Sequence, residues 1–201
     1  MSLDLEKAEA ISDSQLIFSM QAGSLEALGV LYDRHRRMVF RTAIAITGDS
    51  EAAADLSQDV FLRLHRFADH IDPLRPLEPW LYRMTTNLSY TWVKRRQRWL
   101  RPLEDVADWL AGARKDTPAY QAEMDDSWRQ VQQAVLALPL SHRGVVVLYY
   151  VNDLSLLEIS EILDIPVGTV KSRLHYGRQA LKRRLGLLAG EIFPELQYEF
   201  T

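Results

Sequence analysis

The feature that most limits the fold of this chain is the near absence of stretches that could form β-strands. Apolar residues recur every three or four positions along most of its length, which is the spacing of one face of an α-helix. Only residues 144–151 (GVVVLYYV) could pass for a strand, and they follow Ser141, a residue type that often caps a helix. We therefore expect residues 141–151 to form a buried helix and the fold to be all-α.

Turn and cap residues divide the chain into two groups of helices. The first group should form a compact four-helix bundle, because its connections are short. Its first helix is expected to be capped by Asp13 or Ser14. The expected helices of this group cover residues 13–23, 24–47, 50–68 and 80–99. In the second group Ser155 and Glu158 stand at the spacing of a capping box. The expected helices of this group cover residues 128–138, 141–151, 155–163 and 169–185.

An acidic segment rich in turn residues separates the two groups, and we expect it to be a flexible linker. The chain should therefore contain two small helical domains, a linker and a tail. The predicted boundaries are 1–100 for the first domain, 101–126 for the linker, 127–186 for the second domain and 187–201 for the tail. The apolar residues of the tail could cover the second domain, bind an inhibitory partner or belong to a frayed end.

The net charge of −3 hides a segregation of charge along the chain. Residues 79–103 and 165–190 carry six lysines and arginines each and no acid, whereas seven of the nine charged residues in 104–126 are acidic. Two basic patches on either side of an acidic segment can bind a polyanion at two places. The alternative is that both patches are only solvated helix faces.

Several classes of function are poorly supported by the composition. There is no cysteine, so disulfides and cysteine-rich zinc sites are excluded. The five histidines lack the paired spacing of a metal site, and glycine-rich phosphate loops are missing. We expect no enzyme activity, no cofactor and no metal. Without an apolar run of membrane-spanning length or a signal peptide, a cytoplasmic protein that does not bind membranes is expected.

Residues 161–174 (EILDIPVGTVKSRL) place a turn between two helices, and the second helix begins with cations. In that second helix Val170, Leu174, Leu181 and Leu185 share one side, and Gly177 would let a neighbouring helix approach. Polar and basic residues occupy the other side. This arrangement predicts a helix-turn-helix whose second helix enters a DNA major groove. An ordinary amphipathic helix with a soluble face remains the alternative.

The helix expected at residues 80–99 carries two stripes. Leu81, Met84, Leu88 and Trp92 should pack inward. A second stripe alternates aromatic rings with cations and one amide, and it contains Trp80, Arg83, Asn87, Tyr90, Lys94 and Arg98. Rings can stack on unpaired bases while cations hold phosphates, so this stripe predicts single-strand binding. Alternatively, Trp80 only seals the end of the bundle.

Three segments carry a resemblance to a known family, in the family's order. They are ADLSQDVFLRLHRF (54–67), WLYRMTTNLSYTWVKRR (80–96) and LSLLEISEILDIPVGTVKSRLHYGRQALKRRL (154–185). From about residue 14 to 185 the chain resembles bacterial sigma factors of the extracytoplasmic-function (ECF) group of the sigma-70 family, which keep only regions 2 and 4. The resemblance implies an alternative sigma factor that binds core RNA polymerase, recognises −35 and −10 promoter elements and melts DNA.

The resemblance also implies roles for individual residues of the region 2 domain. The residues implied to dock on the clamp coiled coil of core RNA polymerase are Asp55, Gln58, Asp59, Phe61 and Leu62, with Phe61 shared between packing and contact. The residues implied to bind the −10 element are Trp80, Arg83, Asn87, Tyr90, Lys94, Arg95 and Arg98. The loop at 69–79, with Asn87 and Trp80, would shape a pocket for a flipped base. The family's usual aspartate four residues after Asn87 is replaced by Thr91.

In region 4 the resemblance implies contacts with the −35 element and with the polymerase flap. Base edges would be touched by Lys171, Ser172, His175 and Tyr176, and phosphates by Arg173, Arg178 and Ser155, with Thr169 also at the duplex. An anti-sigma factor is a further implied partner, and the acidic linker would lie in the RNA-exit path. Two rival functions are a sigma mimic that titrates an anti-sigma factor and a helix-turn-helix repressor.

Overall fold

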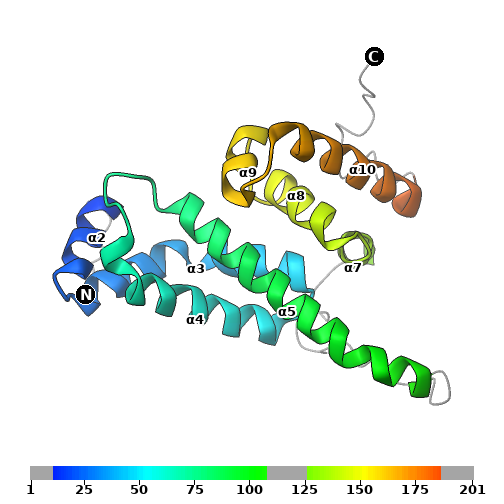
Figure 1. Ribbon diagram of the computed structural model, residues 1–201, viewed down its shortest axis with the longest axis horizontal. Coiled ribbons are helices and arrows are strands. Elements are labelled where there is room, and N and C mark those ends of the chain that lie inside the picture. The colour runs from blue at the N-terminus through cyan, green and yellow to red at the C-terminus, as the bar shows by residue number, and fades with distance from the viewer. Residues whose placement is uncertain (1–10, 108–125, 187–201) are drawn as a thin grey trace.

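The computed structural model describes residues 11–107 and 126–186, which form eight α-helices, one short 3-10 helix and no strand (Figure 1). The all-α prediction is confirmed. The one candidate strand, residues 144–151, lies in a helix up to Tyr150, with Val151 at the C-cap and Val145 and Val147 fully buried. The core of the expected linker (108–125) and the expected tail (187–201) lie outside the described residues.

The first domain contains α2 (Asp13–Gln21), α3 (Leu25–Thr47), α4 (Ser50–Arg66), the 3-10 helix η1 (Ala68–His70) and α5 (Glu78–Ala107). Helices α3, α4 and α5 pack side by side, and α2 packs on α3 (Figure 1). The core of this domain is mostly aliphatic and includes Ile17, Leu31, Val39, Val60, Leu64 and Leu81. A four-helix bundle is therefore present, as the sequence predicts.

All helix ends of the first domain except the end of α5 lie within two residues of the predicted ones, and local side chains fix several of them. The Ser24 hydroxyl accepts from the Ala27 N–H, and the Asp49 carboxylate accepts from the Ala52 N–H. Gly48 ends α3 in the left-handed region, with φ of 71°. One cap was predicted wrongly: α2 is capped by Ser12, one residue earlier than expected, because only Ser12 forms a capping box with Gln15.

Helix α5 is longer than expected. We predicted residues 80–99, since Pro102 lacks the N–H that continues a helix. In the structure α5 runs from Glu78 to Ala107 through that proline. One proline removes one backbone hydrogen bond, and the helical turns on both sides outweigh that loss. The first residues of the expected linker are therefore helical.

The second domain contains α7 (Asp126–Leu136), α8 (Leu140–Tyr150), α9 (Leu156–Leu163) and α10 (Val167–Leu185). Helices α9 and α10 form the predicted helix-turn-helix, and Asp164 makes the turn with φ of 53°. Two local predictions were wrong. Pro139, not Ser141, stands at the N-cap of α8, and Gly168 lies inside α10, because Pro166 already starts that helix.

The predicted apolar side of α10 is confirmed as the side that faces the core. Val170, Leu174, Leu181 and Leu185 are all buried. A Cβ atom on Gly177 would lie only 2.7 Å from Cγ2 of Val146 on α8. Glycine at this position therefore permits the close approach of α10 and α8 that the sequence indicates.

The two domains pack against each other, which the sequence does not predict. Helices α7 and α8 contact α3, and α9 contacts α5. Tyr82 of α5 lies in the buried apolar cluster of the second domain, and Met38 of α3 packs against the clusters of both domains. The apolar interior is thus continuous from one domain to the other.

The capping box of α9 supports a first prediction. The Ser155 hydroxyl accepts from the Glu158 N–H, and the Glu158 carboxylate accepts from the Ser155 N–H. We expect Ser155→Ala to lower the free energy of unfolding by about 1 kcal/mol, measured by urea denaturation. Ser141→Ala is the control, because Ser141 caps no helix. Equal stability of the two variants would contradict the role of the box.

Candidate nucleic-acid interface

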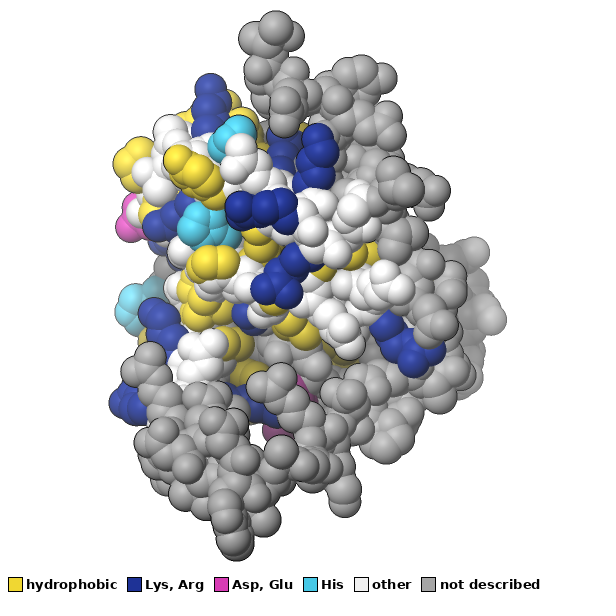
Figure 2. All heavy atoms as spheres, turned by 90° about the vertical axis from the view of Figure 1, so that its right-hand side faces the viewer, with side chains coloured by type: hydrophobic (Ala, Val, Ile, Leu, Met, Phe, Trp, Pro, Cys, Tyr) yellow, Lys and Arg dark blue, Asp and Glu magenta, His cyan; other side chains and the backbone are white. Residues whose placement is uncertain are grey.

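The polar face of α10 is open to solvent. Lys171, Ser172, His175 and Tyr176 are all exposed, and Tyr176 keeps 59% of its surface accessible. Its ring makes edge contacts with His175 and with His142 of α8. Figure 2 shows that Lys and Arg side chains are spread over the upper part of the molecule, at the height of α10 in Figure 1, with few acidic side chains among them. The predicted base-contacting residues therefore lie together on one exposed surface.

The two arginines predicted to hold phosphates are half-buried. Nε of Arg178 donates to the Tyr150 hydroxyl at 2.8 Å. Its guanidinium also lies 5.1 Å and 5.5 Å from the ring centroids of Tyr149 and Tyr150. Two tyrosines at the end of α8 therefore orient Arg178. We did not predict this support, although the Tyr149–Tyr150 doublet is visible in the sequence.

The predicted phosphate contact at Ser155 conflicts with the capping box. The N–H of Ser155 donates to Oε2 of Glu158 at 2.8 Å. Hydrogen bonds from Ser155 lower the pKa of the Glu158 carboxyl, which favours its charged form. A carboxylate therefore occupies the position where a phosphate would bind. Thr169, which the resemblance also places at the −35 duplex, is half-buried.

The predicted single-strand stripe on α5 is divided. Asn87, Lys94, Arg95 and Arg98 are exposed, and Trp80 packs half-buried against the core of the first domain. Arg83 is also exposed and Tyr90 is half-buried, and both contact the second domain. Nε of Arg83 donates to the Ile162 carbonyl and Nη2 to the Glu161 carbonyl, both at 3.0 Å. Tyr90 packs against Gly144 of α8.

The buried position of Tyr90 leads to a prediction on pH dependence. Burial raises the pKa of the Tyr90 phenol to about 12, and the nearby Arg173 and Arg143 oppose the shift. The folded chain therefore holds this proton above pH 10, where the unfolded chain loses it, so stability falls as pH rises from 10 towards 12. We expect the phenolate absorbance of Tyr90, taken as wild type minus Tyr90→Phe, to appear near pH 12. Titration at the ordinary value of 10.0 would contradict the buried position.

The inward side of α5 contains more small polar residues than we predicted. Leu81 is fully buried as expected, whereas Met84, Leu88 and Trp92 are only half-buried. The residues that are fully buried beside Leu81 are Thr85, Thr86 and Ser89. The Thr85 hydroxyl donates to the Leu81 carbonyl at 2.7 Å, so this helix satisfies it internally. An apolar pattern alone does not reveal such positions.

The face of α4 predicted to dock on the polymerase is exposed, with one exception. Asp55, Gln58, Asp59 and Leu62 are exposed, and Leu62 keeps 61% of its surface accessible. Phe61 is only 4% exposed and stacks edge-on with Tyr32 at a centroid distance of 4.9 Å. Phe61 is therefore a core residue here and not a contact residue, since α4 turns it toward α3.

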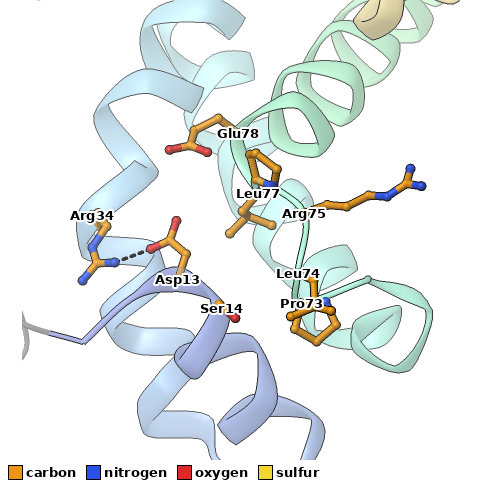
Figure 3. A pocket seen from close by; sticks show the side chains of 9 residues that line it. Asp13, Ser14, Arg34, Pro73, Leu74, Arg75, Leu77 and Glu78 are labelled. Carbon is orange, nitrogen blue, oxygen red and sulfur yellow. Dashed lines mark hydrogen bonds and ion pairs between the residues drawn. The ribbon is translucent and has the colours of Figure 1, made fainter.

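The loop before α5 lines a pocket of about 450 Å³, which is large enough for a nucleobase (Figure 3). Residues 73–78 form one side, and the other side comes from Asp13, Ser14 and Arg34. Asn87 and Trp80, which we expected here, do not line it. Figure 3 shows the Asp13 side chain paired with Arg34, across from the loop that carries Pro73, Leu74 and Arg75. Helix α2 is therefore a pocket element that the sequence did not reveal.

One cluster in the described part of the chain has the residue types of a metal site. Oxygen and nitrogen atoms of Asp13, His35 and Glu78 lie within 4.8 Å of one another. However, Asp13 already forms an ion pair with Arg34, and it lies 2.7 Å from Nε2 of His35. The positive charge of the Arg34 guanidinium would repel a metal ion at this place. We therefore assign the cluster to an ion-pair network.

Comparison with known proteins decides the family. The sequence profile of Sigma-70 region 2 matches residues 31–99, and that of Sigma-70, region 4 matches residues 128–181. The ECF RNA polymerase sigma factor SigW of Bacillus subtilis is 32% identical over 180 residues, which cover 84% of this chain and 94% of SigW. The chain is an ECF sigma factor of the sigma-70 family. Its first domain is region 2, its second domain is region 4, and its class acts in transcription initiation without being enzymatic.

Other relatives agree with this family. The ECF sigma factor SigM of Mycobacterium tuberculosis is 31% identical over 178 residues, covering 88% of this chain and 86% of SigM. Two solved structures share the fold. CnrH in complex with the cytosolic domain of CnrY matches 85% of this chain and 95% of CnrH, with a TM-score of 0.65 and 23% identity. RpoE of Bartonella quintana, in complex with the anti-sigma factor NepR, matches 78% of this chain and 94% of RpoE, with a TM-score of 0.60 and 21% identity.

Among the described helices, none combines the length and the apolar character needed to cross a bilayer.

Proposed function

We propose that this ECF sigma factor binds core RNA polymerase in the cytoplasm, recognises −35 and −10 promoter elements and melts DNA between them. The observation that carries the proposal is the presence of two exposed cationic helix faces, one on α5 in region 2 and one on α10 in region 4. The proposal includes the domain division predicted from the sequence. The region 2 domain covers residues 1–100, the linker 101–126, the region 4 domain 127–186 and the tail 187–201.

Helix α10 is proposed to read the −35 duplex. Its exposed residues Lys171, Ser172 and His175 offer donors to base edges in the major groove, and Tyr176 offers an edge with a hydroxyl. Arg178 is held by Tyr150 at the side of this face, which suits contact with a phosphate.

Helix α5 is proposed to hold the unpaired −10 strand. Lys94, Arg95 and Arg98 lie exposed along its second half and can neutralise phosphates. Asn87 can bond a base edge, and the pocket beside residues 73–78 can accept an extruded base. Extruding a base costs a few kcal/mol, which stacking and hydrogen bonds in the pocket must offset.

The exposed face of α4 is proposed to dock on the clamp coiled coil. Asp55 and Asp59 repel nucleic acid, and an exposed leucine beside them is typical of a protein interface. An anti-sigma factor is a second proposed partner. The support is that RpoE of Bartonella quintana, which shares this fold, was solved in complex with the anti-sigma factor NepR.

Transcription from supercoiled genomic fragments with purified core polymerase tests the proposed function. We expect promoter-specific transcripts, and we expect Asp59→Arg to lower transcription and core binding by about tenfold or more. Glu26→Arg is the matched control, because Glu26 is exposed in the first turn of α3 and not on the docking helix α4. Core binding without initiation would favour the sigma mimic. Binding of the free chain to duplex DNA, together with repression of transcription, would favour the repressor.

A further inference from the structure

Helices α3 and α4 pack side by side (Figure 1), and a pocket of about 300 Å³ lies between them. Its volume is at the lower end of the range of small-molecule sites. One wall comes from Tyr32, Arg36 and Phe40 of α3, which are four positions apart and therefore share one face of the helix. The Tyr32 ring packs edge-on against Phe61, and the Arg36 guanidinium lies 5.7 Å from the centroid of Tyr32. This wall therefore offers two aromatic rings and a cation.

The wall on the α4 side is lined by smaller and polar side chains, those of Ala54, Ser57 and Gln58. The Ser57 hydroxyl donates to the Ala53 carbonyl at 2.6 Å, so its oxygen can only accept a further hydrogen bond. Gln58 is exposed, and its amide can both donate and accept. Because Ala54 ends in a methyl group, a space remains between the two helices. This wall can therefore bond the edge of a polar ring that lies in the pocket.

The pocket has a positive charge. Arg36 and Arg37 line it, and none of the described residues that line it is acidic. Arg36 lies 3.6 Å from Asp33, but both side chains are more than half exposed, so this ion pair is weak. Arg37 is exposed and forms no ion pair within the part of the chain that the structure describes. Guanidinium groups bind phosphate through several parallel N–H donors, so the pocket can bind a phosphate group beside its aromatic wall.

We propose that the pocket between α3 and α4 binds a free nucleoside 5′-monophosphate. The base lies between Phe40 and the guanidinium of Arg36, because aromatic rings and guanidinium planes both stack on bases. The Gln58 amide bonds the edge of the base, and the Arg37 guanidinium holds the phosphate. Adenosine 5′-monophosphate (AMP) is the probe of choice, since a glutamine amide matches the donor and acceptor of the adenine edge.

The pocket shares Gln58 with the α4 face that is proposed to dock on core polymerase. Asp55 and Asp59 lie exposed beside Gln58 on this face. A nucleotide that bonds Gln58 therefore occupies part of the docking face, and docked polymerase covers the pocket. The nucleotide binds only the chain without polymerase and competes with docking. This competition, unlike the pocket itself, rests on the proposed docking role of α4.

Isothermal titration calorimetry of the full chain with AMP, adenosine and inorganic phosphate tests the pocket. We expect AMP to bind about tenfold or more tightly than either of the other two, because only AMP joins a ring to a phosphate. Equal affinity for AMP and phosphate would overturn the proposal, since the cations would then bind any anion. Absence of AMP binding would overturn it as well.

Two variants place AMP in this pocket. Ala54→Leu fills the space for the base from an exposed helix position and should lower the affinity for AMP about tenfold or more. Ala22→Leu is the matched control, because Ala22 is exposed at the end of α2 and does not line the pocket. Arg37→Gln removes the phosphate contact and should also lower the affinity about tenfold. Its control is Arg66→Gln, at an exposed arginine of α4 outside the pocket.

Wild-type affinity for AMP in both pocket variants would overturn the assignment of the site. Binding to core polymerase is then measured with and without saturating AMP. AMP should weaken core binding of the wild type about tenfold or more and that of Arg37→Gln less than about twofold. An unchanged core affinity of the AMP-bound wild type would overturn the competition. Absence of core binding by every protein without AMP would count against the proposed function alone, because calorimetry still reports on the pocket.

Discussion

Reversing two charges, Lys94→Glu with Arg98→Glu, is expected to lower promoter-dependent transcription by about a hundredfold or more. Both side chains are exposed on α5, one helical turn apart, so they lie on one face. Each cation that neutralises a single-strand phosphate contributes about 0.7 to the dependence of log K on log salt, and reversal adds repulsion to the loss. Run-off transcription at several salt concentrations measures both effects.

The matched control for this prediction exchanges the two cations. Lys94→Arg with Arg98→Lys keeps both charges and should retain activity within about threefold, since phosphate contacts depend mainly on charge. Core binding should be unchanged in both double variants. Wild-type levels of transcription by the charge-reversed chain would contradict the proposed role of α5 in binding the −10 element.

Replacing Arg143 by methionine is expected to lower the free energy of unfolding by about 3 kcal/mol. The Arg143 side chain is 6% exposed and donates to the carbonyls of Ile46, Leu136 and Leu138. Burial lowers the pKa of the guanidinium, and its hydrogen bonds to three carbonyls offset the cost of burying the charge. Methionine fills part of the space and leaves all three carbonyls without this donor.

Thermal unfolding measures this loss, and a decrease of about 10 °C in the midpoint is expected for a chain of this size. Arg183→Met is the control, because Arg183 is exposed on α10 and should shift the midpoint by no more than about 2 °C. A midpoint equal to that of the wild type would show that Arg143 does not hold the turn between α7 and α8 in solution.

The sequence was sufficient wherever a local signal decides the structure. Ser24, Asp49 and the Ser155–Glu158 pair start their helices where predicted, because a cap depends on side chains only a few residues away. The buried side of α10 followed from its periodicity for the same reason. The exposed cationic faces of α5 and α10 were also largely visible in the pattern of charges.

Only the tertiary structure decided which predicted site residues are exposed and which of them lie next to one another. Phe61 turned out to be a core residue, and Asp13 joined the pocket beside α5 from a helix far away in the chain. The packing of Gly144 on Tyr90 depends on the fit of two domains that the sequence predicts to be tethered separately. Periodicity shows which side of a helix is apolar, but the surface that covers it is selected by the shapes of both partners.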